Sequence, residues 1–351
     1  MRIGSEGDHI VGAKQRGAIQ ALQFAHEQGL EGVFFKGILD VSPTLDPGEL
    51  REAKACADSL GLYLEAGVGR VNPYNTAESP NVRQLGGGDY RLAVIKMIEA
   101  CRSIDCTELW AETATFKRTH DKYFVFDRFR TDAPWEDQLA ATAKFLSSLR
   151  PVLTDLGCRI NVETHEEISS FEVARLCETV GPDIVGCTFD TANVLARGEV
   201  PMESARRLAP YVHTSHIKDG ILFFAEDGLA WQFRPIGQGV IDWDVMIDTL
   251  APHKPDLNLS LEDSNGIMGV QIYDPAWHAL HPDLTAVELA QYVKLARICE
   301  EKIARGEILS PSAYLEIPME EKQLPNAQAS KAHLLEILER RGLRTPAPAT
   351  V

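Results

Sequence analysis

Short apolar stretches alternate with longer amphipathic stretches along the chain up to about residue 263. The short stretches have the length and the apolar or period-two pattern of strands. In the longer stretches, apolar positions recur every three to four residues, which is typical of helices. We predict strands at 2–5, 32–35, 62–65, 108–112, 159–167 (ending near Glu163), 184–190, 211–219 and 257–263, and helices at 13–28, 48–60, 90–104, 135–156, 171–180, 202–209 and 243–250.

This alternation predicts an α/β fold, a (β/α)8 TIM barrel with a C-terminal helical extension. Eight strands within about 263 residues match the ~250 residues of a typical barrel of this kind. A doubly wound open sheet has the same alternation, but the chain has no Gly-x-Gly-x-x-Gly turn after its first strand and no P-loop. The barrel is therefore the preferred interpretation.

We expect residues 1–266 to form the barrel and residues 267–351 to form an extension of the same domain. The extension has a predicted helix at 284–305, a connector rich in Pro and Glu, and a second helix at 330–341. Its last residues, 345–351, are rich in Pro and Ala, which predicts a disordered tail. Such an extension is expected to wrap around its own barrel or around a sister subunit, and we predict a homo-oligomer.

Charge and cysteine content narrow the class of protein. A formal charge of −16 argues against nucleic acid or an anionic membrane as the main partner, because a polyanion would be repelled. No apolar run is long enough to span a bilayer, and no signal region precedes the first predicted strand. The 7 cysteines are scattered and include no Cys-x-x-Cys pair, which is typical of a reducing compartment. We therefore expect a cytoplasmic protein.

Ionisable residues stand at the ends of nearly all predicted strands, where active sites of this fold lie. Carboxylates that converge at close range repel one another unless a cation holds them together. A set of three carboxylates and one imidazole suits Mn2+, Mg2+ or Co2+ and also admits Zn2+, and we expect one divalent ion, with Mn2+ preferred. The residues at the strand ends are Glu65, Glu112, Glu163 with His165, Asp190, His216 with Lys218, and Glu262, and the proposed metal ligands are Glu163, Asp190, His216 and Glu262.

Motifs at these strand ends resemble those of a known superfamily. They are Val162-Glu163-Thr-His165-Glu166, Phe189-Asp190-Thr-Ala-Asn193, His213-Thr-Ser-His216-Ile-Lys218-Asp219, Ile236-Gly237-Gln-Gly239 and Leu261-Glu262-Asp263. The series resembles the xylose isomerase-like TIM-barrel superfamily, which includes sugar isomerases and epimerases, inosose and 3-dehydroshikimate dehydratases, and endonuclease IV. The resemblance covers about residues 2–266 and implies that the four proposed ligands bind one divalent metal ion.

The nuclease branch of this superfamily uses a three-metal cluster, which makes a direct comparison possible. That cluster needs an additional His three residues beyond the metal-binding Asp and an Asp-x-His pair just before the Ile-Gly-x-Gly turn. This chain has Asn193, Trp231 and Phe233 at those positions, and none of them is a plausible replacement. Together with the negative charge, these differences argue against a nuclease.

The other branches carry out chemistry beside a carbonyl group. A metal ion chelates adjacent oxygens of a hydroxy-ketone and stabilises the enediolate that forms when a base removes the neighbouring proton. In the epimerases that this chain resembles, two metal-bound glutamates also act as acid and base, which implies that role for Glu163 and Glu262. The first prediction is therefore a metal-dependent isomerase or epimerase of a keto-sugar or related polyol.

Two other functions stay open. In the dehydratase branch, a His two residues after the first metal-binding Glu is the base, and this chain has His165 there. That resemblance implies a lyase acting on a keto-sugar, a keto-inositol or a substrate like dehydroshikimate. The third possibility is a non-catalytic sugar-binding subunit, which the presence of four competent metal ligands disfavours.

Four further residues are candidates for substrate binding. Lys218 shares the strand face of the proposed imidazole ligand, and Arg234 stands beside the Ile-Gly-x-Gly turn, so each could hold a substrate oxygen or an anionic group. Glu112 could bind a sugar hydroxyl group. Asn193 stands where the resembled epimerases place a substrate-binding His. His120, in an aromatic loop, is a candidate for a lid residue.

Overall fold

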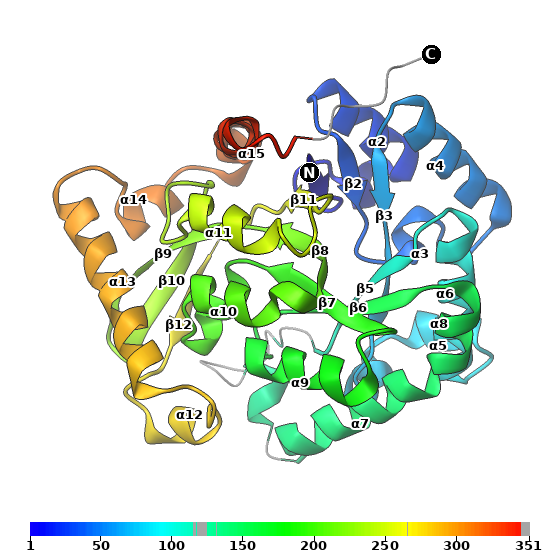
Figure 1. Ribbon diagram of the computed structural model, residues 1–351, viewed down its shortest axis with the longest axis horizontal. Coiled ribbons are helices and arrows are strands. Elements are labelled where there is room, and N and C mark those ends of the chain that lie inside the picture. Colours follow the sequence, from blue (N-terminus) through cyan, green and yellow to red (C-terminus); the bar gives the residue numbers. More distant parts are fainter. Residues whose placement is uncertain (115–116, 118–124, 131, 265, 345–351) are drawn as a thin grey trace.

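A barrel of parallel strands forms the centre of the molecule (Figure 1). The computed structural model describes residues 1–351 except 115–116, 118–124, 131, 265 and 345–351, so His120 and the predicted disordered tail lie outside the described residues. Nine strands pair in the order β3-β2-β1-β11-β8-β7-β6-β5-β4. They are β1 (Arg2–Glu6), β2 (Gly32–Phe34), β3 (Tyr63–Glu65), β4 (Gly67–Arg70), β5 (Glu108–Glu112), β6 (Arg159–Glu163), β7 (Val185–Asp190), β8 (Val212–Ile217) and β11 (Asn258–Leu261).

The nine strands occupy eight positions of the barrel. β3 and β4 follow one another in the chain with Ala66 alone between them. β3 pairs with β2, whereas β4 pairs with β5, so the two short strands together close the ring. The predicted (β/α)8 barrel is confirmed.

Helices cover the outer face of the barrel and connect its strands (Figure 1). Ser169 begins α9 with a reciprocal capping box to Glu172, and Gly157 ends α8 in the left-handed conformation at a φ of 62°. The helices of the barrel are α1 (Ala13–Arg16), α2 (Ala18–Glu27), α3 (Ile38–Val41), α4 (Pro47–Ser59), α5 (Pro80–Leu85), α6 (Tyr90–Ser103), α7 (Trp135–Ser148), α8 (Arg150–Leu156), α9 (Ser170–Val180), α10 (Pro201–Leu208) and α11 (Trp243–Leu250), with 3-10 turns η1 (Pro73–Glu78), η3 (Asp127–Phe129), η4 (Asn193–Arg197) and η5 (Ala209–Tyr211).

Tyr63 fills part of the barrel interior. A Cβ atom at Gly4 would lie 2.2 Å from Tyr63 Oη, and a Cβ atom at Gly32 would lie 2.1 Å from Tyr63 Cδ1. Glycine at these two positions therefore makes room for the ring. The tyrosine hydroxyl forms a hydrogen bond with Ser260 Oγ at 2.8 Å, so the polar end of this buried side chain is satisfied.

Glu65 belongs to the interior of the barrel and not to its mouth. Its carboxylate accepts a hydrogen bond from Asn258 Nδ2 at 2.7 Å, at the first residue of β11. Glu65 therefore ends β3 as predicted, but the third position of the barrel continues through β4 and ends at Arg70.

A second sheet of three antiparallel strands stands beside the barrel, and the sequence pattern did not predict it. Its strands are β9 (Asp219–Ala225), β10 (Gly228–Arg234) and β12 (Ile267–Val270). The predicted strand 211–219 is wrong at its end, because β8 stops at Ile217 and β9 begins at Asp219. The turn Asp227-Gly228 between two apolar runs is a hairpin signal, and Gly228 takes a positive φ of 142° there.

The C-terminal extension packs on the small sheet and on the barrel (Figure 1). Its helices are α12 (Pro275–Ala279), α13 (Ala286–Ala304), α14 (Pro311–Leu315) and α15 (Met319–Arg341). α13 contacts β9, and α15 contacts β1, β11 and α11. α15 begins well before its predicted start at 330, because the helix tolerates Pro325, which the sequence pattern treats as a break. Among the described residues, no helix combines the length and the apolar character that a membrane span requires.

Candidate active site

Four side chains from four neighbouring strands meet at the carboxyl-terminal end of the barrel. Glu163 ends β6, Asp190 ends β7, His216 belongs to β8, and Glu262 follows β11. Each offers one possible ligand atom, and these atoms lie within 4.8 Å of one another. His216 Nδ1 lies 2.8 Å from Glu163 Oε1 and 3.4 Å from Glu262 Oε2. The structure thus brings together the four residues proposed as metal ligands, which we call the four-residue cluster.

The four-residue cluster is almost fully excluded from water, since even the side chain of Glu262 is only 5% exposed. Burial raises the pKa of Asp190 to about 7, although the nearby Lys218 opposes the shift. Burial also acts on Glu163, but His216 outweighs it and holds the pKa of that carboxyl well below its ordinary value. The pKa of Glu262 is likewise low, because Lys218 outweighs the effect of burial. Three carboxyl groups therefore share one small, dry site, where their charges repel.

Two oxygen atoms of the four-residue cluster fit a metal ion. Asp190 Oδ2 and Glu262 Oε2 are buried and accept no well-aligned hydrogen bond from any described residue. Cations approach both atoms, with Lys218 Nζ 2.8 Å from Asp190 Oδ2 and His216 Nδ1 3.4 Å from Glu262 Oε2. Buried anionic oxygens of this kind are stabilised by a cation, and a mostly oxygen donor set is typical of sites for hard divalent ions. The four-residue cluster could therefore hold a divalent metal ion.

Hydrogen bonds from outside the four-residue cluster orient two of its carboxylates. Trp110 Nε1 donates a hydrogen bond to Glu163 Oε2 at 2.9 Å, so that Oε1 faces the cluster. Asp190 Oδ1 accepts hydrogen bonds from Ala192 N at 3.0 Å and Asn193 N at 2.9 Å, which leaves Oδ2 for the cluster. Partners of this kind fix the geometry of metal ligands. Trp110 was not among the predicted site residues, although its place two residues before the end of β5 puts it on the inward face.

Two lysines lie against the four-residue cluster. Lys218 Nζ lies 2.8 Å from Asp190 Oδ2 and 3.1 Å from Glu262 Oε1, and it donates a hydrogen bond to Asn193 Oδ1 at 3.3 Å. The structure therefore places the candidates Lys218 and Asn193 directly beside the cluster. Lys36 Nζ donates to the same Glu262 Oε1 at 3.3 Å. Lys36 was not among the predicted site residues, although it stands two residues past the end of β2 and shares the inward direction of Phe34.

His165 lies just beyond β6, between two carboxylates. Its Nδ1 atom lies 2.5 Å from Glu167 Oε2, and its Nε2 atom lies 2.9 Å from Glu166 Oε2. Thr113 Oγ1 donates a hydrogen bond to the other oxygen of Glu167 at 2.5 Å. Burial lowers the pKa of His165, but the two carboxylates outweigh burial and raise that pKa well above its ordinary value. Both ring nitrogens act as donors, so neither has a free lone pair to accept a proton.

The candidates Glu112 and Arg234 have different surroundings. Glu112, the last residue of β5, forms an ion pair with Arg70, the last residue of β4, at 3.3 Å between Oε1 and Nε. The guanidinium of Arg234 lies 3.9 Å from the ring centre of Tyr314 and donates a hydrogen bond to Leu309 O at 3.0 Å. Both of these partners belong to the C-terminal extension, so Arg234 connects β10 to the extension.

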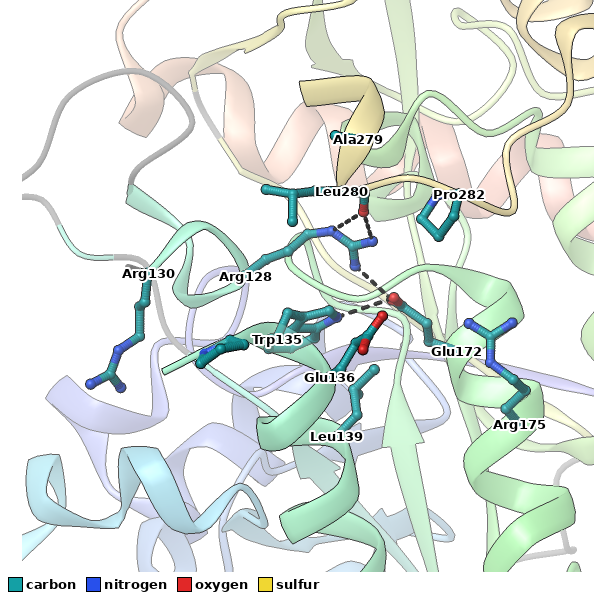
Figure 2. Close-up of a pocket in the computed structure, with 11 residues that line it drawn as sticks. Arg128, Arg130, Trp135, Glu136, Leu139, Glu172, Arg175, Ala279, Leu280 and Pro282 are labelled. Atoms are coloured by element: carbon teal, nitrogen blue, oxygen red, sulfur yellow. Dashed lines mark hydrogen bonds and ion pairs between the residues drawn. The ribbon is translucent and has the colours of Figure 1, made fainter. Parts of the chain in front are cut away.

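A pocket of about 640 Å³ lies between α7, α9 and the segment after α12 (Figure 2). Arg128, which is 2% exposed, donates hydrogen bonds from Nη1 to Glu172 Oε2 at 2.6 Å and to Glu167 O at 3.2 Å. Its Nε atom donates to Leu280 O at 3.1 Å. Trp135 Nε1 donates to the second oxygen of Glu172 at 3.1 Å. This buried network connects α9 and the end of α12 to the turn after β6 that contains His165.

Three comparisons with known proteins are informative. A family model described as xylose isomerase-like TIM barrel matches residues 22–269. Among curated proteins, the 3-oxo-isoapionate decarboxylase of Pectobacterium atrosepticum is 24% identical over 152 residues, 42% of this chain and 54% of that protein. The uncharacterized protein YihM of Escherichia coli K12 is 26% identical over 121 residues, 34% of this chain and 37% of that protein. The matched regions thus span about half or less of these relatives.

Solved structures share the fold at low sequence identity. D-psicose 3-epimerase from Clostridium cellulolyticum H10 has a TM-score of 0.56 and 13% identity, and the match covers 85% of this chain and 99% of that chain. The IolI protein, whose crystal structure contains a zinc atom, has a TM-score of 0.51 and 14% identity, with 88% and 100% of the two chains covered. These similarities concern the barrel architecture.

Proposed function

Because the chain belongs to the xylose isomerase-like TIM-barrel family, we propose that it is a divalent-metal-dependent isomerase or epimerase of a keto-sugar or related polyol. The observation that carries this proposal is the convergence of Glu163, Asp190, His216 and Glu262 at the mouth of the barrel. Similarity in fold to D-psicose 3-epimerase supports the carbohydrate substrate class. A homo-oligomer stays a prediction, to be checked by light scattering of the purified protein.

The four-residue cluster supplies the ligands for the metal ion in this proposal. Bound there, a divalent ion would polarise the carbonyl group of the substrate and stabilise the negative charge that develops on its oxygen. The oxygen-rich donor set favours Mn2+, with Mg2+, Co2+ and Zn2+ as alternatives.

Glu163 and Glu262 would move the proton at the carbon beside the carbonyl group. Each has one oxygen held from outside, Glu163 by Trp110 and Glu262 by Lys218, so its other oxygen is directed to the cluster. Glu163 ends β6 and Glu262 follows β11, with β7 and β8 between these strands, so the two residues would reach the substrate from different directions. Removal of a proton by one residue as a carboxylate, and delivery of a different proton to the opposite face by the other as a carboxylic acid, inverts the carbon, which is an epimerisation.

Substrate oxygens would be bound by polar groups around the cluster. Lys218 and Asn193 lie against each other beside Asp190 and Glu262 and can hold a hydroxyl or carbonyl oxygen. Glu112, paired with Arg70, can accept a hydrogen bond from a sugar hydroxyl group at the opposite side of the mouth. A mixture of donors and acceptors is what a polyhydroxylated substrate requires.

Deuterium exchange tests the proposed function directly. The protein is incubated with Mn2+ in D2O together with ketohexoses, keto-inositols or dehydroshikimate, and the products are analysed by NMR. We expect deuterium at the carbon beside the carbonyl group, in recovered or epimerised substrate, because proton removal there is reversible. Loss of water or of carbon dioxide without epimerisation would contradict the isomerase and indicate a lyase.

The second candidate is a lyase. The surroundings of His165 favour a lyase reaction in which this histidine donates a proton. The related 3-oxo-isoapionate decarboxylase suggests the reaction type. In a decarboxylation, the bond to the carboxylate breaks, its electron pair stays on the substrate as an enolate, and a proton donor completes the product. His165 lies between Glu166 and Glu167 with both ring nitrogens donating, which suits this step. The base role implied by the family resemblance would first require the loss of one of these hydrogen bonds.

Replacing His165 by Asn separates the two candidates. We expect His165→Asn to keep the rate of deuterium exchange within about tenfold of the wild-type rate, because Glu163 and Glu262 move the proton in the proposed reaction. The control is the shift of melting temperature caused by Mn2+, which should be unchanged in the variant. A fall in rate of about 10²–10⁴-fold, the usual contribution of a general acid or base, would assign proton transfer to His165 and contradict its assignment to Glu163 and Glu262. The lyase would then be tested by the loss of water or carbon dioxide.

A further inference from the structure

The mouth of the barrel has two walls. The four-residue cluster lies on the neighbouring strands β6, β7, β8 and β11. The ends of β1, β2, β4 and β5 form the other side of the ring, which we call the facing wall, and they carry Glu6, Lys36, Arg70 and Glu112. A substrate whose carbonyl group lies at the cluster extends toward this wall. Side chains there therefore select the outer groups of the substrate.

Most charged groups of the facing wall are already used. The carboxylate of Glu6 is fully buried and accepts hydrogen bonds from Asp8 N at 2.9 Å and His9 N at 3.1 Å, and it contacts His9 Nδ1 at 3.0 Å. Arg70 and Glu112 form an ion pair. These groups hold one another, so they cannot neutralise a charge on the substrate without losing an existing partner.

Lys36 differs from these groups because its partner Glu262 is already paired with a second cation, Lys218. Its ammonium donates to Glu262 Oε1 at 3.3 Å, while Lys218 Nζ lies 3.1 Å from that same oxygen. The side chain of Lys218 is 4% exposed and that of Lys36 is 27% exposed. Both ammonium groups stabilise the charge of Glu262, but two ammonium groups beside one oxygen repel each other. Lys36 is thus the more accessible of two cations that share one carboxylate, and it has N–H groups available for a further acceptor.

The backbone of Lys36 is held firmly in place. Gly37 forms an antiparallel bridge with Val68 of β4. A Cβ atom at Gly67 would lie 2.6 Å from Lys36 O, so this close approach of the two chain segments depends on glycine. The split of the third strand position at Ala66 therefore brings β4 against Lys36 and Gly37, just beyond the end of β2. A side chain on such a fixed support can determine specificity.

We propose that Lys36 is a specificity-determining residue that binds a carboxylate of the substrate, so that the substrate class is a keto-sugar acid. This inference rests on the proposed function and adds the charge of the substrate to it. The single negative charge of a carboxylate matches the single positive charge of the Lys36 ammonium group. A phosphate carries about −1.5 to −2 charges at neutral pH and would meet Glu6, Glu112 and Glu163 across the mouth, where Lys36 is the more accessible of the two described lysines.

Three matched ligands test the proposal. D-fructuronate, D-fructose and D-fructose 6-phosphate share a ketose skeleton and carry a terminal carboxylate, hydroxyl or phosphate group, and D-tagaturonate and D-tagatose form a second series. Binding to the Mn2+-loaded protein is measured by calorimetry. We expect the uronate to bind at least about tenfold more tightly than the neutral sugar, and Lys36→Met to remove this difference while changing the affinity for the neutral sugar less than about twofold. Lys36→Arg should restore the preference, and Lys96→Met, on the outer helix α6, controls for net charge.

Three other outcomes contradict the proposal, each in a different way, and one control separates binding of the uronate from binding of the metal ion. Equal binding of uronate and neutral sugar to the wild-type protein overturns the role of Lys36 but leaves the proposed function standing. A preference for the phosphate ester that Lys36→Met removes overturns the carboxylate and assigns a phosphate instead. Failure of every ketohexose and uronate to bind overturns both the inference and the proposed function. An unchanged melting-temperature shift with Mn2+ in Lys36→Met shows that a loss of uronate binding is not a loss of the metal centre.

Discussion

Glu262→Gln is expected to lower turnover by a factor on the order of 10²–10⁴ and to remove most of the affinity for Mn2+. Glutamine keeps the size of the side chain but carries no charge. The variant can therefore neither move a proton nor supply one of the three anionic ligands of the cluster. Glu163→Gln should have the same effect, because Glu163 has the equivalent role in the proposed reaction and also forms the ion pair with His216 at 2.8 Å.

Metal binding is measured apart from activity. Elemental analysis after dialysis gives the Mn2+ content, and melting curves give the stabilisation, which amounts to about 2.7 kcal/mol when the free ion is at 100 times its dissociation constant. Glu108→Gln is the matched control: it makes the same chemical change at the first residue of β5, where Glu108 pairs with Arg159 at 2.7 Å. We expect wild type and this control to respond to Mn2+ and the two cluster variants not to. A wild-type protein that does not respond would point to a non-catalytic sugar-binding subunit.

The four-residue cluster was predictable because the active-site residues of a barrel lie at the carboxyl ends of its strands. In a parallel barrel, all strands point their carboxyl ends to one mouth, and the period of two decides which side chains face inward. The strands that carry Glu163, Asp190, His216 and Glu262 have strong apolar patterns. Finding those strands was enough to bring the four side chains together, without knowledge of any loop.

The groups around the cluster were harder to predict because they depend on breaks and on contacts between distant segments. β3 ends at Glu65, but the third barrel position continues after Ala66 to Arg70, and the glycine-rich segment that forms β4 has too weak a pattern to be recognised as a strand. The contact of Arg234 with Tyr314 joins β10 to the extension, and nothing local at either residue predicts it. Periodicity predicts which side chains of one strand or helix face the same way. It does not predict how segments far apart in the chain pack against each other.

The position of His165 between Glu166 and Glu167 was only partly predictable from the sequence. Its partners Glu166 and Glu167 are the next two residues, so the sequence contains them side by side. Whether neighbouring carboxylates turn toward a ring or away from it depends on the turn after β6, and Thr113 and Arg128 fix that turn from other segments. The family resemblance implied a base role for His165 only in the alternative lyase reaction, whereas the geometry presents this histidine as a hydrogen-bond donor.

Arg128→Met is expected to lower the free energy of unfolding by about 3–5 kcal/mol, the usual cost of removing one partner from a buried ion pair. Arg128 is 2% exposed and Glu172 is 5% exposed, and their charged groups are 2.6 Å apart. Without the guanidinium, Glu172 keeps hydrogen bonds from Trp135 Nε1 and Ser169 N but loses its counter-charge in a site that water barely reaches. The carbonyl oxygen of Leu280 loses its donor as well.

Chemical denaturation of three variants measures this effect and separates its causes. Arg175→Met is the matched control, because Arg175 lines the same pocket and pairs with Asp283 at 2.8 Å but is 51% exposed (Figure 2). An exposed pair of this kind contributes at most about 1 kcal/mol, so this variant should unfold close to the wild-type midpoint. The double variant Arg128→Met with Glu172→Met should be more stable than Arg128→Met alone, because it leaves no unpaired charge. If Arg128→Met is no less stable than Arg175→Met, the buried network does not hold α9 and the end of α12 to the turn beside the active site.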